Sequence, residues 1–158
     1  MILRNTQSRT IRYHGGFSLI EVLIALVIMS VGMLGIAGLY VEGMRAGRTS
    51  TFRHHAVTLA SDVADRIRAN RAGAIDYEGV GGNNNCVLGN VDCNASQMAA
   101  NDIWLWKLQA AGMLPNGDVA ITFDDTVNPN TYRIVVSWAE AGETTPPSYS
   151  IIIPVLPF

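Results

Sequence analysis

A run of 20 residues without a charged side chain, residues 22–41, constrains this 158-residue chain more than any other feature. A helix rises 1.5 Å per residue, so a helix of that length covers about 30 Å, the thickness of a hydrocarbon core. The alternative is a helix buried in a soluble core, but such helices are seldom apolar on every face. The run therefore predicts a membrane-spanning helix.

The charges that flank this run predict its orientation. Residues 1–16 contain three arginines and no acidic residue, and the positive-inside rule keeps such an end in the cytoplasm. Everything after Tyr40 is then expected outside the inner membrane, in the periplasm of a Gram-negative cell, where disulfides form.

The N-terminal segment differs from a secretory signal in the order of its parts. A conventional signal has its small-residue cleavage site after the apolar region, whereas Gly15-Gly16 lies before it here. Cleavage after Gly16 would remove the basic leader, and the apolar helix would stay on a mature chain that begins at Phe17.

The stretch GGFSLIEVLIAL resembles the prepilin cleavage and N-methylation motif of type IV pilins and pseudopilins. The basic leader, Gly16, Phe17, Glu21 and the unbroken apolar helix carry the resemblance together. It implies that a prepilin peptidase, which is also the N-methyltransferase, cleaves between Gly16 and Phe17 and methylates the new Phe17 amine. It also implies that Glu21 of one subunit meets the Phe17 amine of a neighbour in a filament.

Physical chemistry is consistent with that role for Glu21. A carboxylate at the centre of a membrane helix costs about 2.5–3.5 kcal/mol, and less near an interface. Glu21 lies four residues after Phe17, so a lone subunit can hold it near the headgroups, where it would need no partner. A neighbour's ammonium group would offset the cost of burial and fix the register between two helices.

Three glycines, Gly32, Gly35 and Gly38, are spaced by three within the apolar run. Small residues at such spacing let membrane helices approach closely, and each glycine also weakens a helix by about 1 kcal/mol relative to alanine. The spacing predicts a helix that packs closely and bends.

Beyond the apolar run the pattern becomes amphipathic. One helical face collects apolar residues at Phe52, Ala56, Leu59, Val63 and Ile67. We expect one long helix from about residue 18 to residue 70, with its second half packed on a globular head. The sequence RANRAG ends it, with Gly73 as the expected stop.

The head is expected to begin at residue 72 with a loop rich in glycine and asparagine. Cys86 and Cys93 in this loop are the only cysteines. A structural disulfide is favoured, since a redox site needs a C-x-x-C-like spacing and a metal site needs further Cys or His ligands, whereas every His precedes the loop.

A short helix and three strands are expected next, the strands near residues 119–123, 132–140 and 149–155. The fold class is therefore α+β and type IV pilin-like, with a long N-terminal helix against a small antiparallel sheet. Four segments follow from this: a leader at 1–16, a membrane or filament-core helix at 17–41, its amphipathic continuation at 42–71, and a periplasmic head at 72–158.

Over the whole chain, the segments DRIRANRAGA, NDIWLWKLQ, LPNGD and YRIVVSW resemble the PilV-like minor pilins. The resemblance implies a low-abundance subunit, anchored in the inner membrane and later in a surface fibre, that primes type IV pilus assembly with other minor and major pilins.

Charge and motifs weigh against several other functions. From residue 72 onward, two basic residues face nine acidic ones, a net charge of −7, which argues against direct nucleic-acid binding. The sequence contains neither GxSxG nor a phosphate-binding GxxxxGK[ST]. We therefore expect no catalytic residues, no metal, no cofactor and no small-molecule substrate.

Two alternatives share parts of this pattern. A type II secretion pseudopilin has the same leader and the same Glu21, but acts in a periplasmic piston. A membrane-anchored binding module that never polymerises would leave Glu21 without a partner.

Overall fold

The computed structural model describes residues 15–87, 89 and 91–155. The chain divides after Met44 into two units, and the longest helix, α1 (Leu19–Ala69), contributes to both.

The N-terminal unit, as far as it is described, is the first half of α1. Its side chains are exposed on every face of the helix, and α1 is the one described helix that is long and apolar enough to cross a membrane. Ser30 is a polar residue inside the apolar run, and its hydroxyl donates to the Leu26 carbonyl at 2.7 Å. This bond removes the cost of an unpaired hydroxyl in hydrocarbon.

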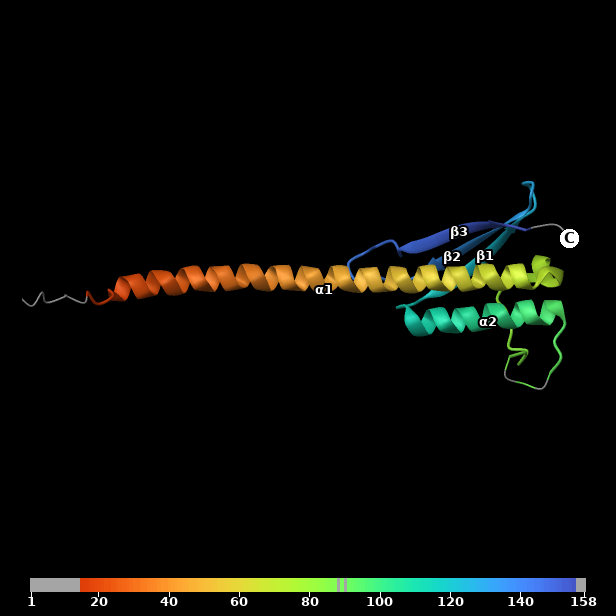
Figure 1. Ribbon diagram of the computed structural model, residues 1–158, viewed down its shortest axis with the longest axis horizontal. Coiled ribbons are helices and arrows are strands. Elements are labelled where there is room, and N and C mark those ends of the chain that lie inside the picture. The colour runs from red at the N-terminus through yellow and green to blue at the C-terminus, as the bar shows by residue number, and fades with distance from the viewer. Residues whose placement is uncertain (1–14, 88, 90, 156–158) are drawn as a thin grey trace, which may run out of the picture. The chain divides into compact units, whose positions relative to one another are not determined.

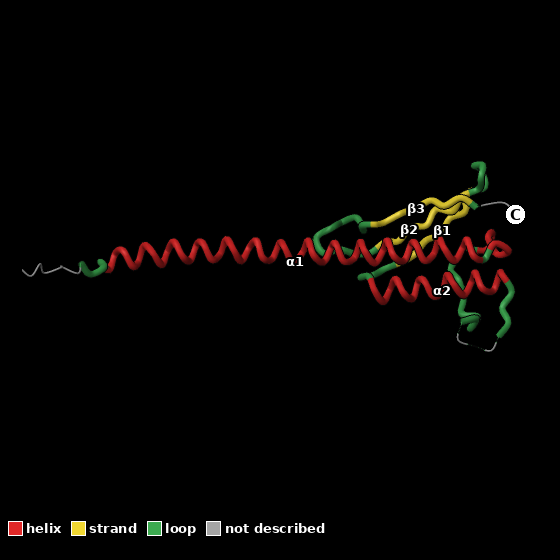
Figure 2. The backbone as a smooth tube through the Cα atoms, in the orientation of Figure 1, coloured by secondary structure: helices red, strands yellow, loops and turns green. Residues whose placement is uncertain are grey.

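The second unit contains the rest of α1 and the head (Figure 1). A 3-10 helix, η1 (Arg71–Asp76), follows α1 and precedes α2 (Ala95–Met113). Three strands complete the unit: β1 (Asp118–Asp124), β2 (Thr131–Ser137) and β3 (Ser148–Pro154). The tube view in Figure 2 shows the two helices beside one another and the strands along α1.

The strands form an antiparallel sheet in the order β1-β2-β3. Alternate residues of the central strand, Tyr132, Ile134 and Val136, are fully buried, as expected for a sheet with one face on the core. The helix side of this core is supplied by Ala56, Leu59, Ala60, Val63, Ala64 and Ile67. The predicted fold class is confirmed, and the predicted apolar face of the helix is the buried one.

α1 ends near the predicted residue, but Gly73 is not the helix stop that the sequence predicted. Gly73 has φ −100°, so it is not a left-handed helix stop, and it lies inside η1. A Cβ at Gly73 would lie 2.6 Å from the Ala95 carbonyl oxygen. Glycine is required there by close packing against the start of α2. The side chain of Asn70 also contacts this point, because its amide donates to the Ala95 carbonyl at 2.8 Å.

A capping box begins α2. The Asn94 side chain accepts from the Gln97 N–H at 2.8 Å, and the Gln97 side chain accepts from the Asn94 N–H at 3.0 Å. These reciprocal bonds satisfy two of the donors left free at a helix start. The N-x-x-Q spacing carries this signal in the sequence, but sequence reasoning had given Asn94 no role.

Candidate assembly surface

Phe17 lies two residues before α1, and Glu21 lies in its first turn. Phe17 is 85% exposed, and Glu21 occupies the first turn, where its N–H donates to the Ser18 carbonyl at 3.1 Å. A carboxylate in the first turn is favoured by the helix dipole. Among the described residues, no hydrogen bond or ion pair involves the Glu21 carboxylate, so it is available to a group outside the described structure.

Large apolar side chains surround the helix beyond Glu21. Those at least 36% exposed include Val22, Leu23, Ile24, Leu26, Val27, Ile28, Met29, Val31, Met33, Leu34, Ile36 and Leu39. Leaving such side chains in water costs about 1.5–3 kcal/mol each, so this surface requires lipid or other apolar helices around it.

The three glycines of this segment do not serve packing within the described chain. A Cβ built on Gly32, Gly35 or Gly38 would meet no atom within 4 Å. A role in close approach to another helix remains a prediction, because the contacts that would test it lie between chains.

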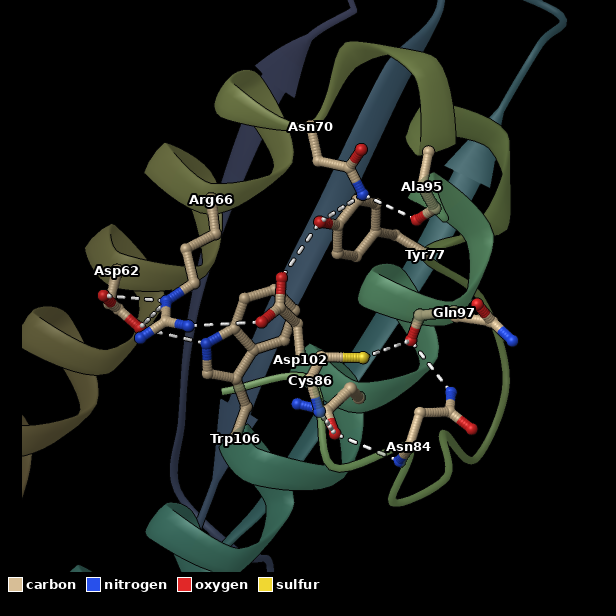
Figure 3. Close-up of polar contacts among 11 residues, drawn as sticks. Asp62, Arg66, Asn70, Tyr77, Asn84, Cys86, Ala95, Gln97, Asp102 and Trp106 are labelled. Carbon is tan, nitrogen blue, oxygen red and sulfur yellow. Dashed lines mark hydrogen bonds and ion pairs between the residues drawn. The ribbon is translucent and has the colours of Figure 1, made fainter. Parts of the chain in front are cut away.

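A polar network holds α2 against the second half of α1 (Figure 3). The guanidinium of Arg66 lies between two carboxylates, 3.2 Å from Asp62 and 3.2 Å from Asp102. The indole N–H of Trp106 donates to Asp62 at 3.0 Å. Burial opposes the charge of Arg66, but attraction to Asp62 and Asp102 outweighs burial and raises the pKa of Arg66.

The same network reaches the segment after η1. The Tyr77 hydroxyl donates to Asp102 at 3.1 Å, and the Asn70 amide donates to that hydroxyl at 3.1 Å. Burial raises the pKa of Tyr77, and the Asp102 carboxylate raises it further, against the opposing bond from Asn70. Every member of this network has a partner, which is the condition under which buried polar groups specify a single packing.

The loop before α2 is closed by a disulfide between Cys86 and Cys93. Its backbone is bound to α2 through Asn101, whose side-chain oxygen accepts from the N–H groups of Asn84 at 3.1 Å and Cys86 at 3.4 Å. Asn101 is buried, so the loop is attached to the helix through an acceptor that lies within the fold.

No catalytic or metal-binding arrangement is visible in the part of the chain that the structure describes. Within it, no three His, Cys, Asp or Glu residues are grouped closely enough to hold a metal. Asp124 lies at the end of β1, where the Thr126 hydroxyl and N–H bond its carboxylate and lower its pKa. That geometry is a turn rather than a catalytic pair.

A charge-poor helix that needs apolar neighbours, followed by an α+β head on the same helix, defines a membrane-anchored subunit of pilin type. Two family models match the chain: the prokaryotic N-terminal methylation motif over residues 11–37, and the type IV pilin Tt1218 family over residues 38–104. Neither the curated proteins nor the solved structures gave a match. The two matches together span residues 11–104 and support a type IV pilin.

The methylation motif implies processing by a prepilin peptidase, and motif and apolar helix together indicate membrane anchoring and pilus association. Most of the predicted leader, residues 1–14, lies outside the described residues. Cleavage after Gly16, methylation of Phe17, the partner of Glu21 and the likeness to PilV-like proteins remain predictions.

Proposed function

We propose that this chain is a minor pilin, PilV-like in type, that primes or joins a type IV pilus after a prepilin peptidase has removed its leader. The carboxylate of Glu21, without a partner on a helix apolar on every face, is the observation that carries the proposal. Such a helix is suited to move from lipid into a bundle of like helices, where the Phe17 amine of a neighbour would pair with Glu21.

The proposal assigns a function to each segment. Residues 1–16 are the cytoplasmic leader, 17–41 cross the inner membrane and later lie in the fibre core, 42–71 continue the helix, and 72–158 form the periplasmic head. The partners are the peptidase, the inner membrane and other minor and major pilins. The protein acts as a structural subunit, without catalytic residues, cofactors, nucleic-acid binding or a small-molecule substrate of its own.

Substitution of Glu21 tests this function. In the native host, Glu21→Ala should reduce the amount of this subunit in sheared surface fibres by about tenfold or more, the effect of losing one buried charge pair. The matched control is Glu42→Ala, because Glu42 is also an exposed acid on α1 but follows the apolar run. It should leave incorporation unchanged.

The membrane fraction is measured in the same cells. Equal amounts of both variants there would show that loss from fibres is an assembly defect rather than degradation. Normal incorporation of Glu21→Ala would contradict the proposed pairing, and absence of even the wild-type chain from surface fibres would favour a pseudopilin or a membrane-anchored module.

A further inference from the structure

The two edges of the head sheet differ in how they are protected. At the β1 edge, the Glu78 carboxylate accepts from the Phe123 N–H, and Lys107 of α2 pairs with Asp118 at 3.3 Å. Charged groups and a covering helix are the usual means by which a protein blocks pairing at a sheet edge. The β1 edge is therefore closed to another strand.

The β3 edge carries no charged residue, and its one protective feature is Pro154 at its end. Two bonds flank the β2–β3 pairing, from the Trp138 N–H to the Pro147 carbonyl and from the Val155 N–H to the Asn130 carbonyl. Since hydrogen-bonded pairs alternate along antiparallel strands, Tyr149, Ile151 and Ile153 bond to β2. The backbone N–H and C=O groups of Ser148, Ser150 and Ile152 then point away from the sheet.

The sequence of β3, SYSIIIP, contains no charged residue, and none of the hydrogen bonds of the described residues involves those outward N–H groups. Ile152 is 55% exposed. Pro154 has no N–H at the next outward position, so the free backbone groups run from Ser148 to Ile152. An uncharged edge with such free groups is a template for one further strand.

Partly exposed apolar side chains lie on the side of the second unit away from α2. β1 lies on the α2 side of the sheet, so β3 is on the other side. Val57 precedes Arg66 by nine residues, which at 3.6 residues per turn places it on the face of α1 opposite the α2 contact. Val57 is 39% exposed there, and Tyr149 and Ile151 are only partly buried.

We propose that the outer edge of β3 binds an extended segment of a different polypeptide in the pilus assembly as a fourth strand. The head has a net charge of −7 from residue 72 onward, so the segment is neutral or basic, with apolar residues at alternate positions beside Tyr149 and Ile151. This inference rests on the proposed function for the identity of the assembly.

A second copy of this chain does not fit the edge as well. The closed β1 edge cannot receive β3 of a copy, which leaves two β3 strands pairing antiparallel about a two-fold axis. That axis would reverse the direction of one α1 relative to the other. Subunits anchored in one membrane have parallel helices, so the strand comes from another protein.

The test uses the full-length chain in its native host, with photo-crosslinking benzoylphenylalanine at position 152. Irradiation should join it to one extended segment of another protein. The same probe at Ala120, also exposed but on β1 at the closed edge, should give no such product. Ser150→Pro removes an outward N–H and should lower the yield at position 152 by about tenfold, whereas Ser150→Ala should not change it.

Melting temperatures of the purified variants in detergent should show that Ser150→Pro leaves the fold intact, since the Ser150 N–H that it removes does not bond to β2. A missing product at position 152, a product insensitive to Ser150→Pro, or one joined to β3 of a second copy would overturn the inference. Assay of sheared fibres separates this inference from the proposed function. A chain that forms the crosslink but is absent from fibres would contradict the proposed function alone. A chain that is present in fibres but forms no crosslink would contradict this inference alone.

Discussion

The Tyr77 hydroxyl donates to the buried carboxylate of Asp102 at 3.1 Å and so bonds the segment after η1 to α2. The same carboxylate accepts from Arg66 on α1 at 3.2 Å. Asp102 of α2 therefore bonds two other segments, α1 and the segment after η1, and its replacement should affect how all three pack together.

Asp102→Asn should lower the free energy of unfolding by about 1–3 kcal/mol, because the amide cannot accept from both donors with a full charge. The loss could be as small as about 1 kcal/mol because Arg66 is 41% exposed and keeps Asp62 as a partner. Urea unfolding of the chain in detergent measures the change. Asp65→Asn is the control: its ion pair with Arg68 is exposed, so the change should stay within about 0.5 kcal/mol.

Alkaline pH should destabilise the head through its buried phenols. Burial raises the pKa of Tyr77 above its ordinary 10.0 and raises that of Tyr132 to about 12. A phenol whose pKa is raised by folding contributes stability that is fully present below pH 10. This stability is lost as the pH rises through the pKa of the phenol in the folded protein. Melting temperature should therefore fall from about pH 10 upward, and Tyr77→Phe should weaken the dependence. An unchanged pH profile in that variant would contradict the role of Tyr77.

Two glycine-to-alanine substitutions should change stability in opposite directions. In Gly73→Ala the new methyl group would lie 2.6 Å from the Ala95 carbonyl oxygen, so a loss of about 1–3 kcal/mol is expected. Gly112→Ala lies in α2 with nothing within 4 Å, and helix propensity should stabilise it by up to about 1 kcal/mol. Thermal melts of the two variants would measure both changes. Equal changes in melting temperature would argue against the close approach at Gly73.

Loss of the disulfide should cost about 2.5 kcal/mol, the chain-entropy value for so short a loop. The double variant Cys86→Ser/Cys93→Ser would be compared with the wild type by urea unfolding, with and without reductant. Reductant should bring the wild type to the level of the variant and leave the variant unchanged. A reductant effect on both would point to a cause other than the disulfide.

The elements predicted from sequence are those whose signals are local. The apolar run and the spacing of Ala56, Leu59 and Val63 predicted α1 to within one residue at each end. Alternation predicted the central strand, the turn at residues 115–117 placed the first strand, and a short apolar run marked the last. These patterns depend on periodicities of 3.6 and 2 that each segment carries alone.

The polar network could not be predicted in the same way. Arg66 and Asp102 are 36 residues apart, and no pattern within α1 distinguishes Arg66 from the exposed Arg68. The path of the chain after α1 was also missed, because η1 depends on the contact of Asn70 with Ala95. Such contacts are decided by tertiary packing, for which a single sequence carries no periodic signal.

If the chain enters a fibre as a processed pilin, its N-terminal peptide should show it. Mass spectrometry would compare that peptide between sheared surface fibres and membranes of the native host. We expect a fibre peptide that begins at N-methylated Phe17. An uncut chain that begins near Met1, or the absence of the protein from fibres, would contradict it.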